Sequence, residues 1–420
     1  MSRTPARPWF IGTSANLSPL FGVWRSLVAR SVRVGEVPSS NLGTPMEERA
    51  AYARLFLYRG RVLGSLASIA AAAVTSVFGI ANAHVTLDGS PTFPILAYYQ
   101  CATTARQAAD AGVDLFVEQP YTACSLLRPN DFDADPPPPG VHVLSDDYSA
   151  AAPDAGWYFP DEPDALGLTA SQLPQLPPSG TTGKLRVVNV SEHFYSAQAL
   201  IRPGYDRSEY ARFADAGDLL GFDLYPIVKF CGRVPLLDVF RAQRELITTY
   251  APNTPTFQWI ETGPMTGECP TIDVTPAIAN AEAWLAVAGG AVGIGWFTAG
   301  WTPGTLWNRW DIEPTMLAQL QATDARLHSL AAVLTAPWSE VAFSDAAGVA
   351  ASSRTYDGAR YVIAVNSTAA AVNVPLRVPQ LGRRTLTVLG EQRTVRSDAH
   401  GVFHDRYGPY AVHLYRAGPA

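Results

Sequence analysis

Eight short apolar segments recur between residues 93 and 297, and most of them end in polar or aromatic residues. Helix-like segments precede several of them, and an alternation of strands with helices predicts a parallel sheet. Eight such units close into a (β/α)8 barrel, whose site lies at the C-terminal ends of the strands. The predicted strands are Pro94–Tyr99, Val113–Val117, Val141–Leu144, Gly156–Phe159, Leu185–Val190, Leu219–Leu224, Thr256–Ile260 and Val292–Phe297.

The segments between and after these strands complete the expected architecture. The predicted helices are Thr103–Ala111, Arg207–Ala216, Leu236–Tyr250, Pro276–Ala288 and Glu313–Leu334. The stretch Ser125–Gly140 contains four consecutive prolines and shows no helical period, which predicts a trimmed barrel there. Beyond Pro337 short β-rich segments are broken by Gly, Asn and Asp, which is typical of an antiparallel β-sandwich. Its predicted strands are Val349–Tyr356, Arg360–Asn366, Val372–Val378, Arg384–Leu389 and Ala411–Tyr415.

The N-terminal part has the pattern of a secretory signal peptide. Arginines follow Met46, the apolar run Val62–Ile80 comes next, and Ala81-Asn82-Ala83 supplies small residues for cleavage after Ala83. A run of about 19 apolar residues leaves a retained membrane helix as the alternative. We interpret residues 1–45 as a spurious or disordered extension. The expected organisation is therefore the extension 1–45, the signal peptide 46–83, the barrel 84–336 and the β-sandwich 337–420, in a secreted protein without stable membrane association.

Charge excludes one class of partner. The formal net charge is −6, and the 31 Lys and Arg residues form no basic run. Nucleic-acid binding needs a clustered cationic face, so we expect no nucleic-acid partner. The seven His residues form no metal-like cluster. We therefore expect a monomer without metal or cofactor.

Two acidic residues follow predicted strands in distinctive strings. One string is Gly156-Trp157-Tyr158-Phe159-Pro160-Asp161-Glu162-Pro163, and the other is Phe257-Gln258-Trp259-Ile260-Glu261-Thr262-Gly263. Pro163 disfavours the helical region for Glu162, which can hold its side chain at the mouth of the strand. By strand count, Glu162 ends strand four and Glu261 ends strand seven. Two surface acids on loops are the plain structural alternative.

This arrangement resembles the clan A glycoside hydrolases, whose barrels carry the acid/base on strand four and the nucleophile on strand seven. The resemblance covers roughly residues 93–335 and rests on strand positions and the two strings. It implies that Glu162 is the acid/base and Glu261 the nucleophile. In that clan strand four commonly ends in Asn-Glu-Pro, whereas here it ends in Asp161-Glu162-Pro163. An ionised Asp161 can only accept a hydrogen bond from a sugar hydroxyl, whereas the family Asn donates one.

The expected chemistry is glycosidic bond cleavage with retention. One carboxylic acid protonates the leaving oxygen and one carboxylate attacks, with the two groups about 5–5.5 Å apart. Glu162 must then be protonated at rest while Glu261 stays ionised. The substrate is expected to be a poly- or oligosaccharide.

Other strand ends supply candidate substrate contacts. Barrels of this type often place a Tyr at strand six, which implies that Tyr225 orients Glu261. Trp296 on strand eight is a candidate for stacking under a sugar ring, and Trp301 beyond it is a further one. Barrel packing is the alternative for Tyr225 and Trp296. Polar and aromatic candidates for binding sugar hydroxyls are Asp161, Asn189, Glu118, Asp146 and Tyr99.

Four cysteines in a presumed exported chain suggest disulfides, and sequence alone allows three pairings. Cys101 and Cys124 follow the neighbouring strands one and two, while Cys231 and Cys269 follow the neighbouring strands six and seven. Topology therefore favours the pairs Cys101–Cys124 and Cys231–Cys269. Free buried thiols are the alternative.

Two other functions compete with a glycosidase. One is a catalytically inactive carbohydrate-binding barrel, which the thin crossovers and Asp161 suggest. The other is a secreted barrel hydrolase in which Glu118, Asp146 and Asp161 bind a metal.

Overall fold

The computed structural model of the protein describes residues 85–87, 90–100, 102–118, 137–148, 154–178, 182–198, 205–263, 269, 273–302, 305–308, 313–341 and 347–419. The predicted N-terminal extension 1–45, the predicted signal peptide 46–83 and the predicted pair Cys101–Cys124 lie outside these residues. So do the side chains of Tyr99, Glu118 and Trp301.

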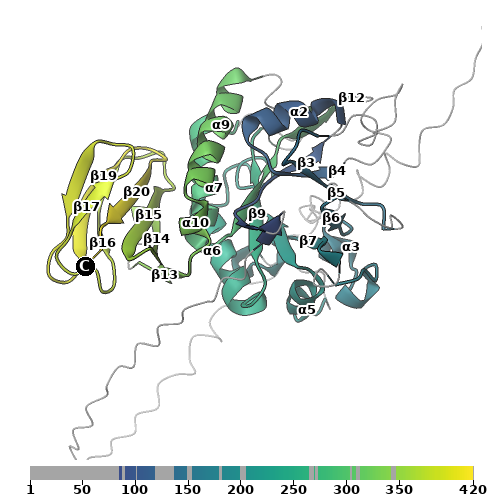
Figure 1. Cartoon of the computed structure of the whole chain (residues 1–420), viewed down its shortest axis with the longest axis horizontal. Coiled ribbons are helices and arrows are strands. Elements are labelled where there is room, and N and C mark those ends of the chain that lie inside the picture. Colours follow the sequence, from purple (N-terminus) through teal and green to yellow (C-terminus); the bar gives the residue numbers. More distant parts are fainter. Residues whose placement is uncertain are drawn as a thin grey trace, which may run out of the picture. The chain divides into compact units, whose positions relative to one another are not determined.

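A closed parallel barrel of eight strands forms the centre of the fold (Figure 1). The strands pair in the order β10-β3-β4-β5-β6-β7-β8-β9, which confirms the predicted (β/α)8 barrel. They are β3 Ile95–Gln100, β4 Leu115–Glu118, β5 His142–Ser145, β6 Gly156–Tyr158, β7 Leu185–Ser191, β8 Leu219–Asp223, β9 Thr256–Glu261 and β10 Gly293–Phe297. All eight predicted strands are present, with ends that differ by at most two residues. β6 is the fourth strand of the barrel and β9 the seventh.

Large aromatic side chains fill the barrel interior, and two glycines make room for them. Gly221 of β8 pairs with Phe257 of β9, and Gly295 of β10 pairs with Trp259 of β9. A Cβ added at either glycine would lie 2.2 Å from the neighbouring aromatic ring. Side chains on a strand alternate between its two faces. Phe257 and Trp259 therefore share the inner face of β9.

Helices cover the outside of the barrel. They are α2 Ala102–Ala111, α3 Pro163–Leu166, α5 Glu209–Ala216, α6 Leu237–Glu245, α7 Pro276–Gly289, α9 Pro314–Ser329 and α10 Ala331–Leu334, with 3-10 turns η3 Ala170–Gln172, η4 Glu192–Phe194 and η5 Ser196–Gln198, and a π-helical turn η6 Leu246–Tyr250. The α7 boundaries follow from its ends: Thr275 caps the N-terminus, Pro276 opens the helix, and Gly290 at φ 107° ends it. In the described residues no helix has the length and hydropathy needed to cross a membrane.

Antiparallel sheets form the C-terminal part. A six-stranded sheet has the order β13-β14-β15-β20-β17-β18, and β16 pairs with β19. The strands are β13 Trp338–Glu340, β14 Val349–Tyr356, β15 Ala359–Asn366, β16 Val372–Arg377, β17 Thr385–Val388, β18 Arg393–Arg396, β19 Val402–Tyr407 and β20 Val412–Ala417. The predicted β-sandwich is confirmed. Two hairpins add to these sheets: β1 Val85–Leu87 pairs with β2 Ser90–Thr92, and β11 Ala299–Thr302 pairs with β12 Thr305–Asn308. Val85 of β1 belongs to the hydrophobic cluster of the barrel.

The six-stranded sheet packs against the helical side of the barrel. Helix α7 contacts β14 and β15, and one hydrophobic cluster includes residues of the barrel, of α7 and of these strands (Figure 1). Arg354 of β14 is 1% exposed. It donates hydrogen bonds to the carbonyls of Leu334 at 3.1 Å and Val287 at 3.0 Å.

Candidate active site

Glu162 leaves the fourth barrel strand in an unusual backbone conformation. It has φ 47° and ψ 56°, in the left-handed region, and Pro163 begins α3 directly after it. Pro163 disfavours the right-handed helical region for the residue before it, as expected from the sequence. The Glu162 N–H donates to the carbonyl of Asn189 on β7 at 3.1 Å. The half-buried side chain is thereby held at the end of the strand.

Asp164 fixes the short helix α3 to the neighbouring strand. Its carboxylate accepts hydrogen bonds from the Ser191 N–H at 2.9 Å, the Ser191 hydroxyl at 2.6 Å and the Tyr210 hydroxyl at 3.0 Å. Asp164 is 3% exposed. These bonds hold the backbone on which Glu162 depends.

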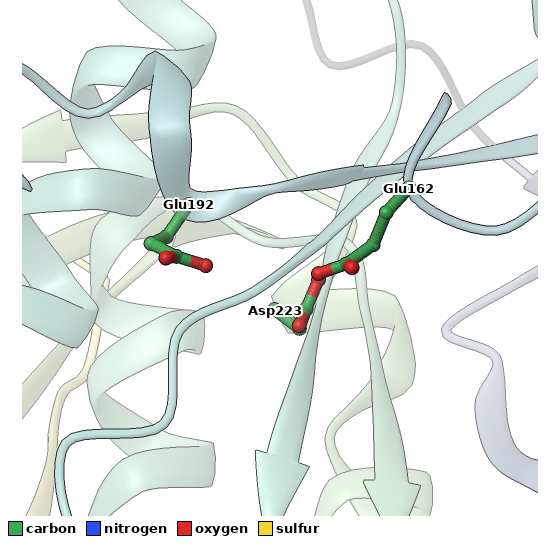
Figure 2. Close-up of side chains that lie close together, drawn as sticks. All are labelled: Glu162, Glu192 and Asp223. Atoms are coloured by element: carbon green, nitrogen blue, oxygen red, sulfur yellow. The ribbon is translucent and has the colours of Figure 1, made fainter. Parts of the chain in front are cut away.

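Three carboxylates from three different elements meet at the barrel mouth. Carboxylate oxygens of Glu162, Glu192 and Asp223 lie within 4.8 Å of one another. Glu162 follows β6, Glu192 begins η4 after β7, and Asp223 ends β8. Figure 2 shows the carboxyl groups of Glu162 and Asp223 facing each other, with Glu192 beside them.

One lysine supplies positive charge to this cluster. Lys229 Nζ lies 2.8 Å from Glu192 Oε2. Burial opposes the ionised form of Glu192, but the charges of Lys229 and His193 hold its pKa below the ordinary value. Burial likewise opposes the charged lysine, yet Glu192, Glu162 and Asp223 raise the pKa of Lys229 above its usual range.

Glu162 and Asp223 form a pair that retains a proton. Burial raises the pKa of Glu162 to about 7, and Asp161 and Glu192 act in the same direction against Lys229. Burial and the charge of Glu162 raise the pKa of Asp223 well above its ordinary value. Two carboxylates in contact cannot both ionise at low cost, so one proton is shared between Glu162 and Asp223.

Asp161 is held by three hydrogen-bond donors. Its carboxylate accepts from the Tyr98 hydroxyl at 2.5 Å, the Tyr158 hydroxyl at 2.9 Å and the Asn189 amide at 2.9 Å. The Asn189 amide also lies 3.4 Å from Asp223. Asp161 and Asn189, both predicted from the sequence, are therefore brought together beside the carboxylate pair.

Glu261 has a different environment. It is 0% exposed, and its oxygens accept hydrogen bonds from the Ile227 N–H at 2.8 Å and the Val228 N–H at 2.7 Å. It also interacts with Glu282 of α7, a helix outside the barrel. Burial raises the pKa of Glu261 to about 7. The carboxyl partner that the structure places against Glu162 is Asp223.

Of the other residues predicted to contact the substrate, some lie at the site and others do not. Tyr225 is buried beside the site, and burial and then the charges of Asp223, Asp161, Glu162 and Glu261 raise its pKa well above the ordinary value. Burial also raises the pKa of Asp146 at the end of β5.

Trp296 does not fit the predicted stacking role. Its ring is 0% exposed, and its indole N–H donates to Asp324 of α9 at 3.0 Å. It points into the layer between the barrel and its helices, so it presents no face to a sugar.

Sequence reasoning missed Asp223, Glu192, Lys229, Tyr98 and Tyr158. Asp223 and Glu192 each stand at a strand end, the signal that identified Glu162. Lys229 is one of only two lysines in the chain, the other being Lys184. Rarity and position could have identified it.

The structure confirms one of the two predicted disulfides. Cys231 and Cys269 are bonded, with 38 residues of separation and a Cα–Cα distance of 5.3 Å. This bond joins the segments that follow β8 and β9.

The fold and this cluster together define a (β/α)8 barrel with a carboxylate site at its C-terminal mouth. No protein-family model and no curated protein matches the sequence. The structure is similar to solved glycosidases such as the alpha-amylase of Geobacillus thermoleovorans, with 11% identity, coverage of 77% of this chain and 98% of that one, and a TM-score of 0.42.

An endoxylanase from Clostridium papyrosolvens is 12% identical, with 78% and 96% coverage and a TM-score of 0.42. A maltogenic alpha-amylase from Thermotoga neapolitana is 9% identical, with 77% and 98% coverage and a TM-score of 0.46. The strand pairing of this chain by itself shows the barrel.

Proposed function

We propose that the protein is a glycoside hydrolase that cleaves O-glycosidic bonds in a poly- or oligosaccharide with retention of configuration. The observation that carries this proposal is the pair Glu162 and Asp223 at the barrel mouth. The two carboxyl groups are in hydrogen-bond contact, which leaves no room between them for a water molecule. Retaining glycosidases place two carboxyl groups about 5–5.5 Å apart, whereas inverting ones leave about 6.5–9.5 Å for a water molecule.

The two members of the pair take different roles. Glu162 is half-buried and stands at the mouth, so it donates the proton to the leaving oxygen and later deprotonates water. Asp223 is 7% exposed, and burial and the charge of Glu162 raise its pKa, so it attacks the anomeric carbon as the carboxylate when the shared proton lies on Glu162. A pair that shares one proton can supply both a proton donor and an attacking carboxylate, and a retaining glycosidase needs one group protonated and the other ionised.

Asp161 serves as a fixed acceptor for a sugar hydroxyl. Tyr98, Tyr158 and Asn189 occupy its carboxylate from the protein side and set its orientation.

Trapping the covalent intermediate tests the assignment. A panel of 2-deoxy-2-fluoro glycosides should label the wild-type protein, and peptide mass spectrometry should locate the label on Asp223. Asp223→Asn should abolish labelling and lower kcat by about 10³-fold or more, as expected for loss of a nucleophile. Glu162→Gln should lower kcat by about 10²–10⁴-fold, most strongly for poor leaving groups.

Other labelling results would revise the proposal in defined ways. A label on Glu261 would restore the strand-seven nucleophile implied by the clan A resemblance. An absence of both turnover and labelling across aryl glycosides and polysaccharides, with sugar binding retained, would identify an inactive carbohydrate-binding barrel. Loss of activity in a chelator would favour the metal-dependent alternative.

We further propose that the protein is secreted as a monomer after cleavage following Ala83. The Cys231–Cys269 disulfide supports an oxidising compartment. Expression of the full-length gene should release a protein whose N-terminal sequence begins at His84. Recovery of an uncleaved chain in the membrane fraction would contradict this and favour the retained helix.

A further inference from the structure

A tight turn follows the sixth barrel strand and carries Lys229. Within residues 226–232 the Cys231 N–H donates to the Ile227 carbonyl at 2.9 Å, and the Gly232 N–H donates to the Pro226 carbonyl at 2.8 Å. The Lys229 N–H donates to the Tyr225 carbonyl at 3.2 Å. The turn is thus an ordered unit, and its orientation determines where the lysine side chain lies.

Two attachments fix this turn to the neighbouring strand β9. The first is Glu261, whose two carboxylate oxygens receive the N–H groups of Ile227 and Val228. The second is the disulfide between Cys231 and Cys269. Two hydrogen bonds from consecutive N–H groups to the two oxygens of one carboxyl group restrain both the position and the direction of the turn.

At the other side of the turn, Lys229 reaches the carboxylate cluster. Its ammonium binds Glu192 and interacts electrostatically with Glu162 and Asp223. Among the described residues, further charged or titratable groups around the pair include Asp161, which acts on both members, Tyr98 and Tyr158, which bond Asp161, Tyr225 and, next to Glu192, His193 at 3.8 Å.

We propose that Glu261 is a positioning residue, which holds the 226–232 turn so that Lys229 lies against Glu192 and gives positive charge to the Glu162–Asp223 pair. The catalytic consequence rests on the proposed function, but the placement of Lys229 does not. Glu261 binds the N–H groups of the two residues that directly precede Lys229. Glu261 thereby influences the protonation of the Glu162–Asp223 pair although its own carboxyl group is not part of that pair.

The sign of the effect follows from electrostatics. A nearby positive charge favours the ionised form of a carboxyl group and lowers its pKa. Removing or displacing Lys229 therefore raises the pKa values of the Glu162–Asp223 pair. The pair would then keep both protons to higher pH, and the attacking carboxylate would be lost in the acidic range.

The placement can be tested without measuring activity. The full-length protein labelled with ¹⁵N-lysine contributes two side-chain ammonium signals, because the chain has only Lys184 and Lys229. Comparison with Lys229→Met assigns the signals. In Glu261→Gln we expect the Lys229 signal to move and broaden. The control Asp324→Asn replaces another buried acid, one bound to Trp296, and should leave the signal in place.

Carboxyl ¹³C titration then measures the consequence for the pair. Its apparent pKa should rise by about one unit in Lys229→Met and in the same direction in Glu261→Gln. Lys229→Arg should restore it, since the charge is kept, and Lys184→Met should not change it. If Glu261→Gln does not fold, Glu261→Asp, which keeps the charge but shortens the reach, should give a smaller shift of the same sign.

An unmoved Lys229 signal together with unchanged carboxyl titration in the folded Glu261 variants would overturn the proposal. The same applies if Lys229→Met leaves the pair unchanged. If wild-type protein cleaves glycosides, the acidic limb of its kcat/KM profile should shift upward in both variants. If it cleaves none, the glycosidase proposal fails while the titration still decides the role of Glu261.

Discussion

At the residue scale, Glu162 combines a strained backbone with a shifted carboxyl group. Its left-handed conformation is uncommon for a residue with a side chain and costs about 1–3 kcal/mol where it persists. The hydrogen bond to Asn189 and the attachment of Asp164 to Ser191 offset that cost. The fold therefore stabilises a conformation whose benefit is the placement of one carboxyl group.

The pKa of Glu162 predicts a pH limit on activity. Burial raises it to about 7, and only the protonated form can act as the acid. The kcat/KM value should therefore fall as the pH rises through about 7. A pH–rate profile on an aryl glycoside measures this, with Glu162→Gln as the control that loses the basic limb. A basic limb that is unchanged in Glu162→Gln would show that another group donates the proton.

The same shift has a consequence for stability. A carboxyl group whose pKa is higher in the folded than in the unfolded state binds its proton more tightly when folded. Its contribution is fully present below the ordinary value of 4.5 and is lost as the pH rises through about 7.

Residues also mark the limit of sequence reasoning. Glu162 and Glu261 carry the same signal, an acid directly after an apolar strand. What separates them is the set of groups around each carboxyl group: Asp223 at the barrel mouth for one, and Glu282 of α7 with two N–H groups of a neighbouring turn for the other. Such partners come from distant segments, so a single sequence does not show them. Trp296 illustrates the same limit, because its direction is set by Asp324 on a later helix.

At the element scale, the barrel strands were predictable because both faces of a parallel strand are buried and the sequence becomes continuously apolar. The C-terminal strands β18 and β19 were missed for the opposite reason. Arg393–Arg396 alternates half-buried and exposed residues at the edge of its sheet, and Val402–Tyr407 contains three charged or histidine side chains.

The disulfide beside the 226–232 turn should contribute to stability through the loop it closes. A loop of 38 residues corresponds to about 4 kcal/mol in the chain-entropy model. Replacing both Cys231 and Cys269 by alanine should lower the free energy of unfolding by an amount of that order. Urea unfolding followed by circular dichroism measures the change. An unchanged midpoint would mean that Glu261 alone restrains the turn.

At the scale of the whole molecule, one arginine connects the barrel helices to the C-terminal sheet. Arg354 donates to carbonyls at Val287 in α7 and at Leu334 in α10, and burial lowers its pKa to about 10. Arg354→Ala should destabilise the protein by about 3 kcal/mol or more, since it leaves buried carbonyls without donors. Calorimetry should still show one transition, because the two parts share a hydrophobic cluster.

A matched variant controls for the loss of an arginine. Arg416 of β20 is exposed and bonds the Tyr361 hydroxyl, so Arg416→Ala should change stability by less than about 0.5 kcal/mol. Two separate calorimetric transitions in wild-type protein would contradict the coupling between barrel and sheet.

The burial of α7 on both sides also affects how the chain folds during its synthesis. Most of its residues are buried, and part of their cover comes from β14 and β15, within a sheet completed only by β20. About 130 residues separate the end of α7 from the end of β20. At roughly 5–20 residues per second, a ribosome needs roughly 6–26 seconds to make them. During that interval the nascent chain exposes an apolar helix, so a chaperone that shields it should raise the yield of native protein.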